Sequence, residues 1–311
     1  MNDIVTDVPH SPAPPTDTAA GPVLDRPADE GGAPPAVELR GVTKRFRLES
    51  GRTVEALRGL DLTIPEGQFA CLLGPSGHGK STLLNLLAGF ATPTEGQVVA
   101  HGGEVDGPSP DRGMVFQRDA LFLWKRVEDN VGFGLKARKV PAAQRREIVD
   151  RYLRLTGLEA FARAWPKQLS GGMRRRVAIA MVMANEPRLL LMDEPFVGLD
   201  YWRRAALHEV LLRLHETSGC TVVFVTHEID EALLLGDRLL VMVNGRLAMD
   251  EPIPLPRPRT ADELVSPVAQ DLKRQVLSHL GDVADLGDDA GRDRALAAGA
   301  EGTVEVDGVG A

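Results

Sequence analysis

Cysteines and long hydrophobic runs are scarce in this chain of 311 residues. Cys71 and Cys220 are too few for a disulfide framework or a thiolate zinc site, so we expect a protein of a reduced, cytosolic compartment. No apolar run approaches the roughly 18 residues that a membrane span needs, and the first residues do not resemble a signal peptide. If the protein acts at a membrane, we therefore expect a partner to hold it there.

Basic residues are also in deficit, but only at the ends of the chain. The formal net charge is −8, from 36 Lys and Arg against 44 Asp and Glu. Residues 1–36 carry −5 and residues 281–311 carry −6, which leaves +3 on residues 37–280. This balance argues against a uniformly basic nucleic-acid binder.

The composition changes along the chain and indicates where a domain begins and ends. Residues 1–36 contain eight prolines and no long apolar pattern, which predicts a disordered, acidic, proline-rich arm. Residues 37–250 alternate short apolar strands with helical segments and predict an α/β domain, with a helix-rich insert at about 118–186. Residues 251–280 read as a proline-rich connector and a short helix, and residues 281–311 as a disordered acidic tail. The runs RLLLMDEP and CTVVFVTH are apolar on both faces, as in buried strands of a parallel sheet.

A glycine-rich loop, GPSGHGKS, lies between the expected strand FACLL and the expected helix STLLNLL. It matches G-x-x-x-x-G-K-[ST], in which backbone N–H groups and a helix N-terminus hold phosphate oxygens. We expect Lys80 to neutralise the β- and γ-phosphates and the Ser81 hydroxyl to bind Mg²⁺. The predicted nucleotide loop consists of Gly74, Pro75, Ser76, Gly77, His78, Gly79, Lys80, Ser81 and Thr82.

A second motif, RLLLMDE, is an apolar strand that ends in two carboxylates. In this pattern Asp193 would hold Mg²⁺, and Glu194 would emerge at the carboxyl edge of the sheet and accept a proton from the attacking water. Alone, the pattern is more often a strand end with solvated acids. Together with the phosphate loop, it favours a nucleotide-hydrolysing site.

A third motif, LSGGM, precedes the helix MRRRVAIAMVMA and includes Ser170, Gly171 and Gly172. A serine and two glycines at a helix N-terminus form a second anion site or a simple helix cap. With this motif the chain resembles the ATP-binding subunits of ABC transporters. The resemblance implies a head-to-tail dimer, in which these three residues close over the γ-phosphate bound by the other subunit.

The resemblance carries further expectations for the fold and for single residues. It implies an α/β P-loop NTPase (RecA-like) core, an antiparallel β subdomain and a helical insert specific to ABC proteins. Gln117 would contact Mg²⁺ and water, Asp200 would lie at the dimer seam, His227 would touch the γ-phosphate, and Phe46 would stack on adenine. The implied cofactors are ATP and Mg²⁺, with Lys80, Gln117, Glu194 and His227 as catalytic residues and Ser81, Gln117 and Asp193 as metal ligands.

Within the family, the motifs look most like those of nitrate, sulfonate and taurine importers. This likeness implies a Mg²⁺-dependent ATPase that lies at the cytoplasmic face of the cell membrane and energises the import of a small anion. The implied partners are a second ATPase subunit, a separate transmembrane permease and, indirectly, a substrate-binding protein, while no nucleic acid is expected. The alternative is a soluble ABC-type ATPase of a cytosolic assembly with no membrane partner.

Some positions depart from the family pattern. His78 stands where relatives have a small residue or cysteine, and its imidazole would either point to solvent or lie near phosphate. Arg175 replaces a common glutamine, and we expect the run Arg174 to Arg176 to be a solvated helix face. The segment LFLWKRVEDN lacks the proline that is usual after its first two residues. None of the remaining histidines lies in a metal-spaced cluster, so we expect them at the surface: His10, His101, His208, His215 and His279.

Overall fold

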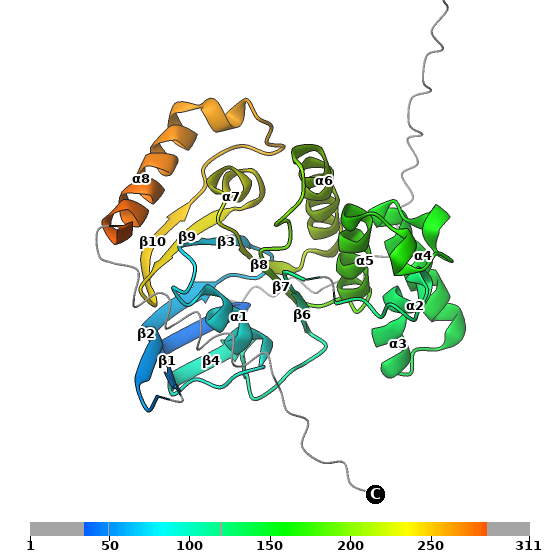
Figure 1. Ribbon diagram of the computed structural model, residues 1–311, viewed down its shortest axis with the longest axis horizontal. Coiled ribbons are helices and arrows are strands. Elements are labelled where there is room, and N and C mark those ends of the chain that lie inside the picture. The colour runs from blue at the N-terminus through cyan, green and yellow to red at the C-terminus, as the bar shows by residue number, and fades with distance from the viewer. Residues whose placement is uncertain (1–33, 49, 119, 285–311) are drawn as a thin grey trace, which may run out of the picture. The chain divides into compact units, whose positions relative to one another are not determined.

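Short apolar strands form a central six-stranded sheet in the order β10-β9-β3-β8-β7-β6 (Figure 1). The computed structural model describes residues 34–48, 50–118 and 120–284. Five strands are parallel, and β10 pairs antiparallel with β9 at the edge. The strands are β3 (Phe69–Leu73), β6 (Arg112–Val115), β7 (Leu189–Asp193), β8 (Thr221–Val225), β9 (Arg238–Val243) and β10 (Arg246–Pro252). The predicted buried strands RLLLMDEP and CTVVFVTH are thus confirmed as β7 and β8.

Successive side chains of the central sheet enter two different hydrophobic cores. In β3, Phe69, Cys71 and Leu73 belong to one core, and Ala70 and Leu72 belong to the other. This alternation follows from the two-residue period of a strand, and every one of these side chains is buried because both faces are covered.

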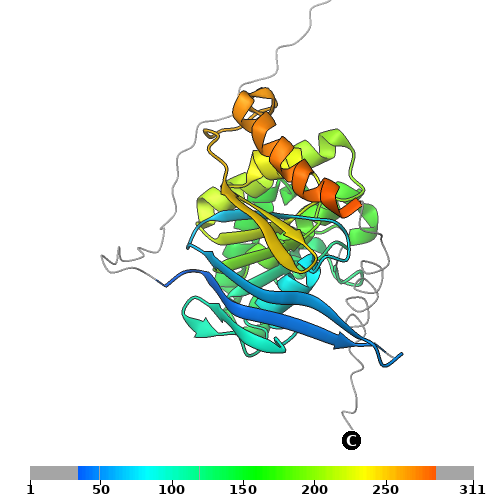
Figure 2. The same cartoon turned by 90° about the vertical axis from the view of Figure 1, so that its left-hand side faces the viewer.

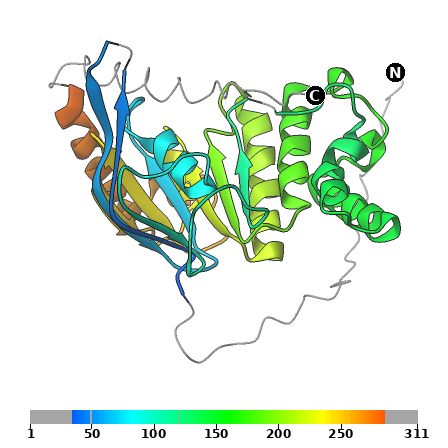
Figure 3. The ribbon, with the colours of Figure 1, turned by 90° about the horizontal axis from the view of Figure 1, so that it is seen from below.

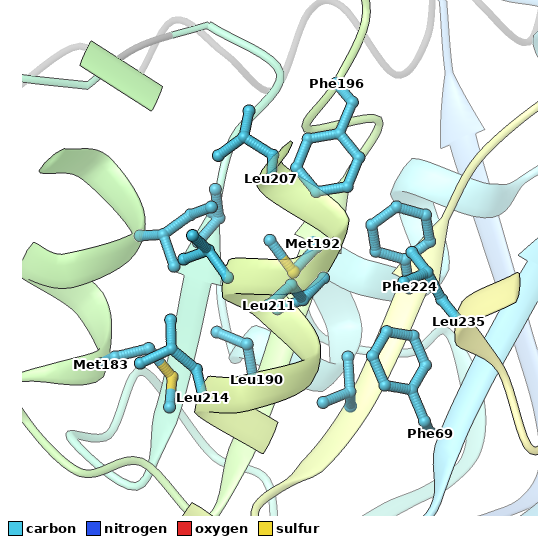
Figure 4. Packing of buried hydrophobic residues seen from close by; sticks show 14 of the residues in the cluster. Phe69, Met183, Leu190, Met192, Phe196, Leu207, Leu211, Leu214, Phe224 and Leu235 are labelled. Carbon is cyan, nitrogen blue, oxygen red and sulfur yellow. The ribbon is translucent and has the colours of Figure 1, made fainter. Parts of the chain in front are cut away.

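Aromatic and aliphatic side chains pack together on the face that Figure 4 shows. The ring centroid of Phe224 lies 5.9 Å from that of Phe69 and 5.5 Å from that of Phe196. Leu207 and Leu211 of the covering helix α6 (Tyr201–Ser218) point into the same cluster. The helices on this face are α5 (Gly171–Met183), α6, α7 (Ile229–Leu235) and α8 (Pro267–Ala284).

The opposite face is covered by α1 (Lys80–Ala88) and by a four-stranded antiparallel sheet in the order β2-β1-β4-β5 (Figure 2). Val37 pairs with Ile64 and Arg47 with Thr53, so the first two strands are joined along nearly their whole length. The strands are β1 (Val37–Arg47), β2 (Thr53–Ile64), β4 (Glu95–Ala100) and β5 (Gly103–Glu104). The α/β P-loop fold with an antiparallel subdomain is therefore confirmed.

Three further helices lie beyond β6, away from the antiparallel sheet (Figure 3). They are α2 (Val127–Val131), α3 (Phe133–Ala137) and α4 (Ala142–Thr156). Two 3₁₀ turns, Glu159–Phe161 and Pro166–Gln168, connect α4 to α5. These four helices, α2 to α5, fall within the range where the helical insert is expected, and we refer to them as the helical insert.

The segment after β10 is packed against the domain. Ile253 and Leu255 are buried in the core, and Arg259 donates hydrogen bonds to the backbone carbonyls of both. A third 3₁₀ turn, Glu263–Val265, precedes α8. Pro267 begins this helix, where its missing N–H costs nothing, and the helix continues to Ala284, beyond the predicted end at residue 280. The segments predicted to be disordered, residues 1–36 and 281–311, reach too far into the domain: Ala36 is buried next to β1, and residues 281–284 continue α8. The rest of both segments, residues 1–33 and 285–311, lies outside the described part of the chain.

Three of the histidines expected at the surface are half-buried and contact other residues of the domain instead. Nδ1 of His101 lies 2.6 Å from a carboxylate oxygen of Glu66, and Nε2 of His208 lies 2.9 Å from one of Glu231. Nδ1 of His215 lies 3.0 Å from the Cys220 carbonyl oxygen. The prediction was wrong for these three because spacing along the chain does not reveal contacts between elements. His10 lies outside the described residues.

Both cysteines are buried, and neither forms a disulfide. Burial raises the pKa of the Cys71 thiol well above its ordinary value, so this thiol is not a reactive thiolate. Among the described helices, none has the length and apolarity that crossing a bilayer requires.

His215 is expected to make the fold acid-sensitive. Burial lowers the pKa of its imidazole, which packs edge-on against Phe69. The unfolded chain therefore binds the proton more readily, so the stabilisation is complete above the ordinary pKa of about 6.5 and falls as the pH decreases below it. His215→Asn, which keeps a donor near the Cys220 carbonyl but does not titrate, should show a smaller loss of unfolding free energy between pH 7 and pH 5. Urea unfolding followed by circular dichroism measures this difference, with His279→Asn as the control. Equal pH slopes for wild type and His215→Asn would contradict the prediction.

Candidate functional site

The phosphate loop turns sharply between the end of β3 and the start of α1. Gly74, Gly77 and Gly79 have φ angles of +154°, +78° and +102°, which side-chain-bearing residues rarely adopt. Space is restricted as well: a Cβ atom on Gly79 would lie 2.6 Å from the carbonyl oxygen of Ala56, and one on Gly74 would lie 2.3 Å from that of Met242. Such consecutive turns bring backbone N–H groups together as an anion-binding nest at the N-terminus of α1.

Lys80 is held by the loop that precedes it. Its ammonium donates hydrogen bonds to the carbonyl oxygens of Gly74 (2.7 Å) and Pro75 (2.9 Å), and the residue is only 5% exposed. Burial lowers the pKa of Lys80, and the nearby carboxylates of Glu194 and Asp193 oppose this shift. Two of its three N–H groups fix the ammonium in place, so the third can reach a phosphate oxygen without rearrangement.

Ser81 and Asp193 together offer oxygen ligands that fit a magnesium ion. Burial raises the pKa of Asp193, while a hydrogen bond with the Ser81 side chain lowers it. A half-buried carboxylate beside a hydroxyl is a hard oxygen donor set, which Mg²⁺ prefers. Within the described residues, no group of three or more His, Cys, Asp or Glu is placed to hold a metal. An ion here would thus take further ligands from substrate phosphates and water, as Mg²⁺ commonly does.

Glu194 lies where three loops meet. An Oε atom of Glu194 is 3.5 Å from Nε2 of Gln117 and 3.6 Å from Nδ1 of His227, and these two residues follow β6 and β8. The backbone of Glu194 has a φ of +43°, a left-handed conformation that costs about 1–3 kcal/mol. Its N–H donates to the Val225 carbonyl at 3.0 Å, which holds this strained turn against β8.

Two adjoining cavities share Glu194. The larger, of about 240 Å³, is lined by residues of the phosphate loop, β2, the segment after β6 and the end of β7: Ala56, Ser76, Gly77, Gly79, Lys80, Ser81, Thr82, Gln117, Asp193 and Glu194. The smaller, of about 60 Å³, is lined by Glu194, His227 and Thr226, among others. Its volume suits about four water molecules rather than a nucleotide. Glu194 thus borders both the phosphate cleft and a smaller space that has room for a few water molecules.

The residues of the third motif do not line this cleft. The Ser170 hydroxyl caps α5 by accepting a bond from the Met173 N–H at 3.3 Å. Asp200 caps α6 in the same manner, with the Arg203 N–H at 3.0 Å. Phe46 lies half-buried on β1, and the Lys44 Nζ atom is 4.9 Å from the centroid of its ring. Phe46 is also not among the described residues that line the cleft.

His78 takes neither of the two expected positions. Its side chain is buried, and Nδ1 accepts a hydrogen bond of 3.1 Å from the backbone N–H of Asn244. The next residue in that turn, Gly245, donates to the His78 carbonyl at 3.2 Å. The imidazole therefore ties the phosphate loop to the turn between β9 and β10.

Sequence reasoning missed two sets of residues that support the site. Thr226 donates to Glu231 at 2.5 Å, and Glu231 in turn contacts His208, so the residue before His227 is anchored to α6 and α7. Arg175, expected on a solvated face, is 6% exposed and donates to the carbonyls of Phe116 and Gln117. No local pattern indicates either contact, because each joins segments that are distant in the chain or lie on different elements.

An exposed aromatic surface adjoins Gln117. We define the aromatic surface as Phe90, Phe116, Phe122, Leu123, Trp124 and Phe133. Trp124 is 72% exposed and Leu123 is 62% exposed.

Buried Asn130 holds the loop that carries these two side chains. It accepts a hydrogen bond from the Phe122 N–H at 2.8 Å, and its amide group donates to the carbonyls of Phe122, Lys125 and Arg126. The loop thus presents large apolar side chains to solvent from a rigid backbone.

Comparisons with known proteins show which sequences are similar to this chain. The ABC transporter family matches residues 57–197. A taurine import ATP-binding protein of Ruegeria pomeroyi is 44% identical over 220 residues, which are 70% of this chain and 82% of that protein. A bicarbonate transport ATP-binding protein of Synechococcus elongatus is 43% identical over 74% of this chain and 35% of its own length.

Solved structures are similar to the chain over the same region. One is an ATP-binding cassette in a dimeric, post-hydrolysis state with ADP and phosphate bound; it is 34% identical, with a TM-score of 0.63, over 70% of this chain and 98% of its own. Another, from an ABC transporter complex of Clostridium perfringens, is 27% identical, with a TM-score of 0.66, over 81% of this chain and 98% of its own.

Replacing Gly79 by alanine should weaken nucleotide binding. The new Cβ meets the Ala56 carbonyl oxygen, so the backbone N–H groups of the loop must move. Gly41→Ala is the matched control, because Gly41 also has a positive φ, +57°, but a methyl group there would have no neighbouring atom within 4 Å. We expect affinity for a fluorescent ATP analogue to fall about tenfold or more in Gly79→Ala. Equal affinities of the two variants would contradict the role of this close approach.

Proposed function

Because the chain belongs to the family of ABC transporter ATP-binding proteins, we propose that it is the ATP-hydrolysing subunit of an ABC importer for a small anion. The observation that carries this proposal is the convergence of Lys80, Ser81, Gln117, Asp193 and Glu194 on one cleft. The names of similar proteins support taurine or bicarbonate as cargo, and the likeness of the motifs adds nitrate and other sulfonates. The chain itself contacts nucleotide rather than cargo.

In the proposed reaction, the phosphate loop and Lys80 bind the triphosphate of ATP. Glu194 accepts a proton from the attacking water, whose oxygen forms a bond to the γ-phosphorus while the bond to the β-γ bridging oxygen breaks. Gln117 and His227 flank that carboxylate and can hold the water and the γ-phosphate in line. Lys80 stabilises the charge that develops on the phosphate oxygens, and its fixed position avoids reorganisation during the reaction.

Ser81 and Asp193 would hold Mg²⁺, with Gln117 as a third oxygen donor. When bound, the ion would neutralise phosphate charge and orient the β- and γ-phosphates. Asp193 is suited to this role because its half-buried carboxylate lacks full solvation, and a cation ligand offsets that cost.

A second copy of the chain would complete the site. Ser170, Gly171 and Gly172 lie outside the cleft of their own chain, at the N-terminus of a 13-residue helix that favours anions. The dimeric state of similar solved structures supports pairing of two copies, and the head-to-tail arrangement is what the family resemblance implies. Asp200 would lie at the seam, beside Trp202, whose 79% exposure leaves a large apolar side chain for the partner to cover.

The aromatic surface would bind the separate transmembrane permease. Its rings form two contacting groups, Phe90 with Phe116 and Phe122 with Trp124 and Phe133. Large exposed apolar side chains such as Leu123 and Trp124 are typical of a protein interaction site. Phe116 belongs to this surface and directly precedes Gln117. A partner that displaces Phe116 would therefore also displace Gln117 in the cleft. This binding would keep the protein at the cytoplasmic face of the membrane and link it indirectly to a substrate-binding protein. The same exposed surface disfavours the alternative of a soluble ATPase with no membrane partner.

Replacing Glu194 by glutamine should abolish most ATP turnover and keep ATP binding. The amide retains the size of the side chain but cannot accept the proton, so we expect a fall of about 10²- to 10⁴-fold in kcat. Steady-state phosphate release by the full chain measures this change. Glu228→Gln is the control, since Glu228 lies 3.8 Å from His227 but does not line the larger cavity. Near-normal turnover by Glu194→Gln would refute the assignment of the base.

Replacing Trp124 by glutamate should release the permease. A charge in an apolar interface must be desolvated on binding, so we expect a co-expressed permease that co-purifies with the wild-type chain to be lost from this variant. Leu277→Glu is the matched control, because Leu277 is a similarly exposed apolar residue on α8. The ATP affinity of both variants should equal that of wild type. Retention of the permease by Trp124→Glu would show that it binds elsewhere.

A further inference from the structure

Arg175 joins the helix of the third motif to the segment that carries Gln117. It lies in the second turn of α5, whose first residues are Gly171 and Gly172. Its Nη1 donates to the Phe116 carbonyl at 2.8 Å and its Nη2 to the Gln117 carbonyl at 2.5 Å. The planar guanidinium thus donates hydrogen bonds to two consecutive carbonyls, a geometry that the compact ammonium of lysine does not reproduce.

Phe116, the residue before Gln117, is also held by a second contact. The Phe116 ring stacks on Phe90, with centroids 6.0 Å apart and an angle of 13° between the planes. Phe90 follows the C-terminal end of α1, the helix of the phosphate loop. Beyond Phe116, the Gln117 side chain reaches Glu194 at 3.5 Å. Arg175 therefore fixes the backbone from which Gln117 extends.

We propose that Arg175 is a positioning residue that sets Gln117 against Glu194 and makes this placement depend on the orientation of α5. Because Ser170 and Gly172 lie at the start of the same helix, a shift of α5 moves the Gln117 backbone with it. When a second copy with bound nucleotide docks on α5, the Gln117 of the chain that owns this α5 would then move within its own cleft. This inference rests on the proposed ATPase function and adds a residue through which the helical insert acts.

The first test measures steady-state ATP hydrolysis by the full chain carrying Arg175→Lys or Arg175→Met. Both should lower kcat by about tenfold to a hundredfold with little change in KM for ATP, because the phosphate loop is untouched. Arg176→Gln is the control, since the Arg176 guanidinium lies beside Gly157 rather than the Gln117 segment. In a Gln117→Ala background the same Arg175 variants should have little further effect, because Arg175 acts through Gln117. A kcat within twofold of wild type for Arg175→Lys, or multiplicative losses with Gln117→Ala, would overturn the proposal.

A second readout does not require activity. Arg118 is exposed directly after Gln117, so trypsin cleavage there reports how firmly the segment is held. We expect cleavage after Arg118 to accelerate severalfold in Arg175→Lys and Arg175→Met, and to be unchanged in Arg176→Gln. An unchanged cleavage rate in both Arg175 variants would overturn the proposal even if the chain hydrolyses ATP. Absence of hydrolysis in wild type, with the cleavage difference present, would instead refute the proposed function and keep Arg175 as the anchor.

Discussion

Burial of both faces of the central sheet is the constraint on which the site depends. The strands β3, β7 and β8 are almost wholly apolar and lie between two hydrophobic cores, so they cannot present polar groups along their length. Polar side chains can follow only where these strands end. Because the strands are parallel, their carboxyl ends lie at one edge, where Lys80, Asp193, Glu194 and His227 meet.

Opposite charges at this edge support each other: the Glu194 and Asp193 carboxylates oppose the loss of charge on the buried Lys80 ammonium. Lys80 and Asp193 would each be costly alone, since burial lowers the pKa of Lys80 and raises that of Asp193, and the like charge of Glu194 raises the pKa of Asp193 further. Lys80 is further held by two backbone carbonyls, and Asp193 by Ser81. The site is thus arranged in advance for a polyanionic ligand and a cation, and the Glu194 side chain, on a strained backbone, lines both the phosphate cleft and the smaller cavity beside it.

Residues that depart from the family pattern have structural partners in this chain. His78 accepts a bond from the turn between β9 and β10, and Arg175 holds the carbonyls of Phe116 and Gln117. Both are buried, and both join a loop of the site to a separate element. Read along the chain, each looked like a substitution on a loop or a solvated helix face, because the partner atoms are backbone groups that carry no sequence signal.

The sequence by itself determined the fold class, the phosphate loop and the two strand-end carboxylates, because each depends on a local pattern: period-two burial, glycines that permit positive φ, and acids directly after an apolar strand. It also predicted the family, from motifs in a fixed order. Only the tertiary structure decided which side chains meet. These are the contact of Gln117 with Glu194, the burial of Arg175, the packing of residues 253–280 on the core and the partners of His208 and His215. All of them join segments that are far apart in the chain or on different elements, and such contacts are set by the packing of the elements rather than by residue spacing.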